Sequence, residues 1–321
     1  MIKFFILLIV LMNFSFANWK SEREGLDKYL FVDDFRMFYT LKGKHSLPKK
    51  NQVDKDKNNI PDYIENLMFR LIQSKKIYVD VLKFKNPLSS KRYKDVKYID
   101  IHILKSEGSS AGDAVIFYNY KSFNNKYKSI SMKLSNNLRE GTYTPSHEYF
   151  HILQNAYSMF KNRWYTEGTA RWSERIFKKG TGKREPLPKS QKELDKLLKK
   201  TYSTKYFWRR LAYICDTNNG RFLLPENFQT KFKDYPVFIE DSRIYGFDFM
   251  KHFFKNLGIE AKKASQDRGF NEFDWSEYEQ RENTNNNKYI LKALRVSIKQ
   301  SCQPLNYEVR AFLNMLNNYL G

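Results

Sequence analysis

Two histidines and a glutamate with close spacing form the group of side chains best suited to chemistry in this sequence. His147 and His151 are four residues apart, and Glu148 directly follows the first of them. Four residues are slightly more than one helical turn, so both imidazoles would project from one face and can share a metal ion. Glu148 would project about 100° around the helix from His147, within reach of a water on that ion. The spacing therefore predicts a zinc peptidase site in which Glu148 is the general base.

The residues around this motif favour a helix. Thr144 can cap a helix start, Pro145 supplies the fixed φ of a first helical position, and Glu148 lies near the positive end of the helix dipole. The alternative interpretation is a buried helix that carries two incidental histidines. Because the chain has only 5 histidines in 321 residues, a chance match is rare, and the motif favours a metal site.

A second segment, residues 164–174, offers a third metal ligand in Glu167. A catalytic zinc ion takes three protein ligands and keeps one position open for water, and two histidines with one glutamate are a known set. Small residues at Gly168 and Ala170 would let this helix approach the first one closely. The alternative is an amphipathic helix whose two tryptophans anchor it in the core, which explains the tryptophans but not the Glu-Gly pair.

Together, H-E-Y-F-H and W-Y-T-E-G-T-A-R-W resemble the pattern of the gluzincin metalloproteases, in which a glutamate on the next helix is the third zinc ligand. The resemblance implies zinc ligands at His147, His151 and Glu167, and a water-activating base at Glu148. It departs at Arg171, where the thermolysin branch has an aspartate that partners the first histidine. Glu174 is a candidate for that partner role.

Oxygen-bearing side chains at calcium-loop spacing occupy residues 54–65, here called the acidic loop. Its candidate calcium ligands are Asp54, Asp56, Asn58, the backbone carbonyl of Ile60, Asp62 and Glu65. Asn59 stands where such loops usually have glycine, and asparagine tolerates the left-handed conformation required there. The alternative is a solvated acidic loop before a helix. With the two metal motifs, the loop resembles a group of exported bacterial gluzincin-type proteins, in scattered blocks over residues 54–174, and this implies no particular substrate.

Residues 1–17 have the pattern of a secretory signal peptide. One lysine precedes an apolar run over residues 4–12, and Ser-Phe-Ala ends the segment with small residues two positions apart. The apolar run is too short for a lasting membrane anchor. We therefore expect an exported protein, periplasmic or secreted, with no stable membrane span after removal of the signal; an uncleaved anchor is the alternative.

Composition and charge limit the remaining function classes. A hydrophobic content of 41% and an aromatic content of 17% are typical of a globular chain with a substantial core. The net charge of +22 comes from scattered lysines without a recognised nucleic-acid-binding motif, so we expect no specific nucleic-acid binding but a surface that attracts acidic partners. Cys215 and Cys302 would form one disulfide in an exported protein, or remain two buried thiols.

The expected fold is α+β and resembles a two-lobed zincin. Period-two patterns predict strands in residues 29–39, 96–104, 114–118 and 129–134, and His102 is expected to be a sheet residue without a chemical role. Helical patterns cover residues 191–200, 206–213 and 245–254. The predicted division is a signal peptide at 1–17, an N-terminal region at 18–92, a catalytic lobe with a small mixed sheet and the two-histidine helix at 93–180, and a mainly helical lobe at 181–321.

These observations predict an exported zinc endopeptidase that hydrolyses peptide bonds of protein or peptide substrates. Stabilising the oxyanion of the tetrahedral intermediate needs a donor opposite the zinc, and Tyr245 is the candidate, with Tyr206 and His252 as others. One alternative is a zincin-fold protein that has lost catalysis. The other is a calcium-stabilised surface-binding protein in which the helix motif is structural.

Overall fold

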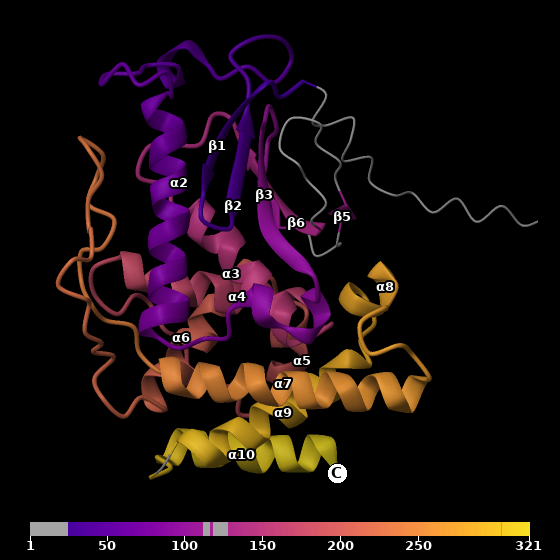
Figure 1. Ribbon diagram of the computed structural model, residues 1–321. Coiled ribbons are helices and arrows are strands. Elements are labelled where there is room, and N and C mark those ends of the chain that lie inside the picture. Colours follow the sequence, from indigo (N-terminus) through magenta and orange to yellow (C-terminus); the bar gives the residue numbers. More distant parts are fainter. Residues whose placement is uncertain (1–24, 112–115, 118–127, 303) are drawn as a thin grey trace, which may run out of the picture.

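Runs of apolar and β-branched residues in the first half of the chain form one mixed sheet (Figure 1). The computed structural model describes residues 25–111, 116–117, 128–302 and 304–321. The strands are β1 (Lys28–Val32), β2 (Phe35–Tyr39), β3 (Val96–Leu104), β4 (Ser110–Ala111), β5 (Ile116–Phe117) and β6 (Lys128–Ser135). The predicted signal peptide lies outside the described residues, as do positions 114, 115 and 118 of one expected strand.

The sheet combines antiparallel and parallel neighbours in the order β1-β2-β3-β6-β4, and β5 also pairs with β6. β1 and β2 form an antiparallel hairpin, while β3 runs parallel to β2 and β6 runs parallel to β3. The short strands β4 and β5 are antiparallel to β6. Within the described part of the chain, β4 therefore ends the sheet beyond β6.

A buried ion pair joins two neighbouring strands. Arg36 on β2 donates to both carboxylate oxygens of Asp100 on β3, at 2.7 and 3.0 Å, and the Ser129 hydroxyl donates to the same carboxylate at 2.7 Å. Removing one partner of such a pair would leave an uncompensated buried charge, which costs about 3–5 kcal/mol. His102 on β3 is buried and stacks on Phe38, so it is a sheet residue, as expected.

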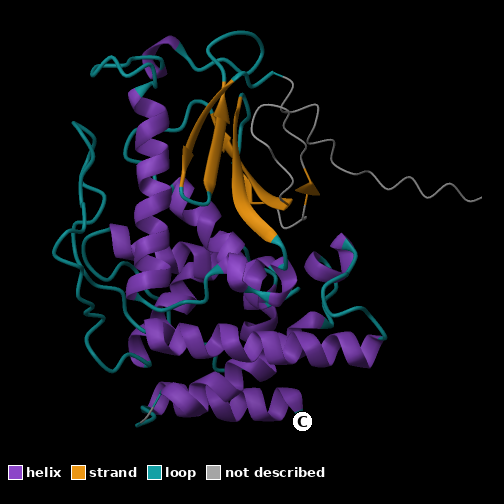
Figure 2. Ribbon diagram, in the orientation of Figure 1, coloured by secondary structure: helices purple, strands orange, loops and turns teal. Residues whose placement is uncertain are grey.

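Helices cover the sheet and make up the second half of the chain (Figure 2). They are α2 (Asp62–Lys75), α3 (Thr144–Tyr157), α4 (Arg163–Ser173), α5 (Gln191–Leu198), α6 (Lys205–Ile214), α7 (Phe247–Arg268), α8 (Glu277–Arg281), α9 (Asn286–Ser301) and α10 (Tyr307–Leu320). The shorter helical turns are η1 (Lys49–Asn51), η2 (Lys76–Val81), η3 (Pro87–Ser89), η4 (Lys91–Tyr93), η5 (Glu174–Phe177) and η6 (Tyr202–Thr204). In Figure 1, α3 and α4 lie between the sheet and the layer of α7, α9 and α10.

The helix with the two histidines, α3, is held by apolar packing on its buried side. Tyr149, Phe150 and Leu153 are fully buried, and Phe150 packs on both Trp172 of α4 and Phe254 of α7. Contrary to the expectation that Thr144 is a cap, the residue is the first of the helix, and its amide donates to the Thr142 hydroxyl at 3.2 Å. Tertiary packing and this hydrogen bond, rather than a cap at Thr144, define the start of the helix.

Gly168 makes room for a different neighbour from the one expected. A side-chain carbon added at this position would lie 2.4 Å from both the Trp208 ring and the Thr204 hydroxyl. Trp208 of α6 stacks on Trp164 with ring centroids 5.6 Å apart, and its indole nitrogen donates to the Trp164 carbonyl at 3.0 Å. The glycine thus permits close contact of α4 with α6 rather than with α3.

One disulfide links two helices in the second half of the chain. Cys215, at the end of α6, forms a disulfide with Cys302, at the end of α9, across 87 residues of sequence. A loop of that length would be worth about 4–5 kcal/mol in the chain-entropy model of disulfide stabilisation. Among the described residues, none of the helices combines the length and apolar character that crossing a membrane requires.

Candidate metal centre

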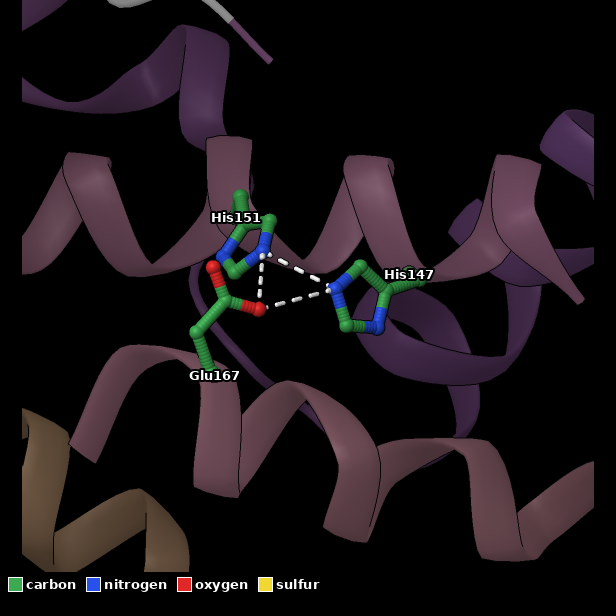
Figure 3. Close-up of side chains that lie close together, drawn as sticks. All are labelled: His147, His151 and Glu167. Carbon is green, nitrogen blue, oxygen red and sulfur yellow. Dashed lines mark hydrogen bonds and ion pairs between the residues drawn. The ribbon is translucent and has the colours of Figure 1, made fainter. Parts of the chain in front are cut away.

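The two histidines of α3 and the glutamate of α4 converge on one point (Figure 3). The Nε2 atoms of His147 and His151 lie 3.1 Å apart, and they lie 3.4 and 3.6 Å from Oε2 of Glu167. Ligand atoms that sit about 2.0–2.1 Å from a tetrahedral zinc ion are separated by about 3.3–3.4 Å. The three residues therefore have the donor types and the spacing of a zinc site.

One atom of this cluster lacks the hydrogen bond that its burial demands. Glu167 Oε2 is buried and accepts no hydrogen bond within the described residues, although it faces both imidazole Nε2 atoms. Buried carboxylate oxygens are costly without a partner. A cation between these three atoms would satisfy the carboxylate and both nitrogen lone pairs together.

The charge balance of the cluster supports this interpretation. Burial alone would lower the pKa of His147, but the nearby carboxylates of Glu167 and Glu174 outweigh burial and raise the pKa to about 9. Burial would likewise raise the pKa of Glu167, but the two histidines hold it well below its usual range. The pocket is thus strongly selective for positive charge, which a divalent ion supplies in a compact form.

Glu174 fixes the orientation of the first histidine. Its Oε1 lies 2.9 Å from His147 Nδ1, and because a carboxylate only accepts, this nitrogen carries the proton of the neutral imidazole and Nε2 is its electron-pair donor. Arg171 donates to the same carboxylate at 2.8 Å, as does Lys178. The arginine that departs from the thermolysin pattern therefore supports the glutamate that was the candidate partner.

Gln154 performs the same task for the second histidine, and sequence reasoning missed it. Its amide nitrogen donates to the Thr166 carbonyl at 2.9 Å and to the Thr169 hydroxyl at 2.6 Å, both on α4. Its amide oxygen therefore faces His151 Nδ1, at 2.7 Å, so that Nδ1 carries the proton and Nε2 faces Glu167. The available signal was its position three residues after His151, which places the two on adjoining parts of one helix face.

The cluster lines a cleft. A cavity of about 120 Å³ is lined by residues of β4 and the segment before it, of α3, α4 and the connection between them, of η6 and of α8: Ser109, Ser110, His147, Glu148, His151, Asn155, Lys161, Thr166, Glu167, Tyr202 and Arg281. An adjoining hollow of about 640 Å³ shares Ser109, His147, Glu148 and Tyr202 with it. Glu148 is buried, with 6% of its surface exposed, and lines both spaces together with His147.

The expected oxyanion donors lie elsewhere. Tyr245 lines a separate hollow with Trp172, and its ring packs on Tyr213. The ring of Tyr206 packs against lysine side chains, and His252 is hydrogen-bonded to a serine of α9. None of the three lines the cleft.

Tyr202 of η6 is the tyrosine shared by both spaces of the cleft. Its ring centroid lies 6.5 Å from that of His147. The guanidinium groups of Arg171 and Arg163 approach this ring to 5.2 and 5.9 Å. The sequence around η6 gave no indication that Tyr202 would line the cleft.

The acidic loop also gathers its carboxylates. Oxygens of Asp54, Asp56 and Asp62 lie within 4.8 Å of one another, and Asn59 has the left-handed backbone, φ 69°, that its position was expected to need. Asn58 donates to Glu65 Oε1 at 2.9 Å, which connects the middle of the loop to its last residue. This arrangement brings together the side-chain ligands expected from the spacing. The expected role of the Ile60 carbonyl as a calcium ligand stays a prediction.

An internal cation occupies the acidic loop. Lys233 Nζ lies 2.9 Å from Asp56, 2.8 Å from Asp62 and 2.5 Å from Glu65. Burial alone would lower the pKa of Lys233, but its hydrogen bonds to these carboxylates outweigh burial and raise the pKa. A distant segment of the chain thus places a positive charge where a bound ion would lie.

The fold and the site define a mixed α+β protein with a buried cluster of two histidines and a glutamate that lines a cleft. No family model, no curated protein and no solved structure matches the chain. The function is therefore argued from the site itself.

Proposed function

We propose that this protein is an exported zinc-dependent endopeptidase of the gluzincin type, with a zincin-like, two-lobed architecture. The observation that carries the proposal is the cluster of His147, His151 and Glu167. Each imidazole has its Nδ1 held by an acceptor and its Nε2 aimed at the same buried carboxylate oxygen, which lacks a hydrogen bond within the described residues. Residues arranged only to pack a core have no need of such matched orientation.

The reaction assigned to this site is peptide hydrolysis. A zinc ion held by the three ligands would supply a water of lowered pKa and polarise the scissile carbonyl. Glu148 would act as the proton carrier, accepting a proton from the attacking water and donating it to the leaving amine. Tyr202, which lines both spaces of the cleft, is the proposed donor to the developing oxyanion, in place of the more distant Tyr245.

The sheet supplies a binding surface for an extended substrate. β4 ends the sheet within the described residues and contacts α3, and Ser109 and Ser110 line the cavity above the metal cluster. An edge strand can pair with an extended peptide through backbone hydrogen bonds. We infer that β4 holds the substrate so that its scissile bond lies over Glu148.

The decisive experiment is the Glu148→Gln variant. It should bind one zinc ion per chain, as the wild type does, because Glu148 is not a ligand, but lose peptide cleavage by a factor of about a hundred or more. Elemental analysis and digestion of a peptide library, each with and without a chelator, measure the two properties. Glu226→Gln is the matched control, because this exposed glutamate lies outside the cleft. Undiminished cleavage by the Glu148 variant would refute the mechanism.

The same measurements test the alternatives. A protein of this fold without catalysis would bind zinc stoichiometrically and cleave nothing. Arg171, the departure from the thermolysin pattern, does not favour this alternative, because it donates to the glutamate that orients His147. A calcium-stabilised surface-binding protein would contain calcium without stoichiometric zinc. The disulfide between α6 and α9 is the kind of bond that persists in an exported protein, which supports the proposed export.

We also propose that the acidic loop binds calcium in competition with Lys233. The ammonium group contacts carboxylates at three of the expected ligand positions, so an ion that enters the loop has to displace it. Lys233→Met should therefore bind calcium about tenfold or more tightly than the wild type, measured by calorimetric titration. Lys231→Met, an exposed neighbour, is the control. Equal calcium affinities for both variants and the wild type, or no binding by any of them, would contradict the proposal.

A further inference from the structure

We propose that a hollow lined by three arginines binds a monatomic anion, with chloride as the common ion of matching size. The arginine hollow is defined by Arg175 of η5, Arg184 of the segment that follows η5, and Arg209 of α6. It shares no lining residue with the cleft. The inference therefore stands independently of the proposed peptidase function.

Each of the three guanidinium groups has a buried nitrogen that lacks a hydrogen bond within the described residues. These atoms are Arg175 Nε, Arg184 Nη1 and Arg209 Nε. The nitrogens of arginine only donate, so the missing partner has to be an acceptor. A buried donor is costly without a partner, and more so when it belongs to a charged group. Three such donors around one hollow are best satisfied by one acceptor that carries negative charge.

Two of the guanidinium groups approach the same bare stretch of backbone. A side-chain carbon added at Gly182 would lie 3.2 Å from both Arg175 Nε and Arg209 Nη1. Gly182 has a left-handed φ of 69°, which favours glycine and keeps this space free of a side chain. The guanidinium of Arg184 lies 3.7 Å from the centre of the Tyr213 ring. Such stacking fixes the plane of the group and leaves the N–H donors, which lie in that plane, available.

No carboxylate of the described residues forms an ion pair with these three arginines. Three carboxylates act on Arg175 only through their charges: Glu174, Asp241 and Glu240. Glu174 instead pairs with two other basic side chains, and Asp241 lies 3.6 Å from Arg243 Nε. The positive charge of the hollow is thus only partly compensated from within the chain.

The arginines also act unfavourably on one another. Burial lowers the pKa of Arg209 to about 10, and the charge of Arg175 lowers it further in the same direction. Burial lowers the pKa of Arg175 as well. An anion in the hollow would favour the charged form of both groups and offset their repulsion.

The size of the hollow selects the kind of anion. Its volume of about 10 Å³ corresponds to room for about one particle of the size of water. Chloride is only slightly larger than water and accepts hydrogen bonds from several directions. A phosphate or sulfate group is much larger and would have to push the side chains apart. A water molecule would fit, but it would leave the positive charge uncompensated.

Thermal unfolding of the protein as purified measures chloride binding. Sodium chloride replaces sodium gluconate at constant ionic strength, because gluconate is too large for the hollow and the exchange leaves general screening of the +22 charge unchanged. A ligand that binds only the native state, at about ten times its Kd, lowers the unfolding equilibrium constant about tenfold. We therefore expect a saturable rise of about 2–4 °C in the midpoint.

Variants of the hollow are compared with a matched arginine elsewhere. Arg184→Met and Arg209→Met should each abolish the chloride-dependent rise. Arg295→Met should keep it, because this half-buried arginine of α9 lies outside the hollow and contacts an asparagine of α10. In gluconate, Arg209→Met should be at least as stable as the wild type, because it removes a charge that Arg175 repels. A variant that merely damages the fold would lose stability in both salts.

Crystals grown in sodium bromide locate the ion, because bromide replaces chloride and scatters X-rays anomalously. An anomalous peak between Arg175, Arg184 and Arg209 supports the inference together with the chloride-dependent rise. Equal midpoints in chloride and gluconate, a chloride response that survives both hollow variants, or absence of a peak in the hollow overturns it. A response to phosphate that exceeds the response to chloride, and is lost in both variants, overturns the assignment to a monatomic ion.

Discussion

Replacing Gln154 with leucine tests whether zinc affinity depends on the orientation of His151. The side chain is 2% exposed and makes three hydrogen bonds, one to His151 Nδ1 and two to Thr166 and Thr169 of α4. Leucine fills a similar space but leaves the imidazole N–H without its partner and removes one of the donors to the Thr166 carbonyl, which keeps the contact from the Thr169 hydroxyl. The ring is then no longer held with Nε2 towards Glu167.

The expected magnitude follows from these contacts. Loss of an outer partner of a ligating histidine lowers metal affinity by about 10–100-fold, which is about 1.4–2.7 kcal/mol. Leaving buried polar groups unpaired costs about 1–3 kcal/mol each in the stability of the metal-free protein, less whatever water recovers. Gln154→Leu should therefore bind zinc about 10–100-fold more weakly and unfold at lower urea concentration.

Competition with a chromophoric chelator measures the zinc affinity, and urea unfolding of the metal-free protein measures the stability. Gln73→Leu is the matched control, because Gln73 is a buried glutamine on α2 whose side-chain oxygen has no hydrogen bond within the described residues. It should leave the zinc affinity unchanged. If Gln154→Leu binds zinc as tightly as the wild type, the argument that Gln154 orients His151 is wrong.

Two further predictions concern stability. Gly168→Ala should destabilise the fold by about 1–3 kcal/mol through overpacking against Trp208, whereas Gly108→Ala, with open space around it, should be neutral in the same urea titration. Burial alone would raise the pKa of Glu308, but its hydrogen bonds, first that from Arg210, lower it. Its contribution to stability is therefore complete above the unfolded pKa of about 4.3 and is lost as the pH falls towards the folded value. Glu308→Gln should make stability less dependent on pH in that acidic range, and an unchanged pH profile would contradict this.

Local periodicity was sufficient to predict the side chains that share one helix. The four-residue spacing placed both histidines on one face of α3, and the left-handed Asn59 followed from the turn position it occupies. Such features depend on neighbours within one turn, where sequence distance and spatial distance agree. Glu167 could be predicted as a ligand because its motif is short and follows the two-histidine motif closely in the sequence.

Contacts between distant segments could not be predicted in the same way. Gly168 was expected to face α3, but it contacts α6, because the choice of neighbour depends on where Trp208 packs. Lys233 reaches the acidic loop from a segment more than a hundred residues away, and no spacing rule links them. Tyr202 enters the cleft for a similar reason, since its position depends on how η6 packs against α4.

One short connection joins the two helices that supply the metal cluster. Residues 158–162 join α3 to α4, and so short a link makes the two helices adjacent and antiparallel, which brings Glu167 opposite the histidines. Met159 and Phe160 anchor the link in the core, and Lys161 binds α8 through its backbone. A change in the length of this link would therefore displace Glu167 from its position opposite the two histidines and weaken metal binding.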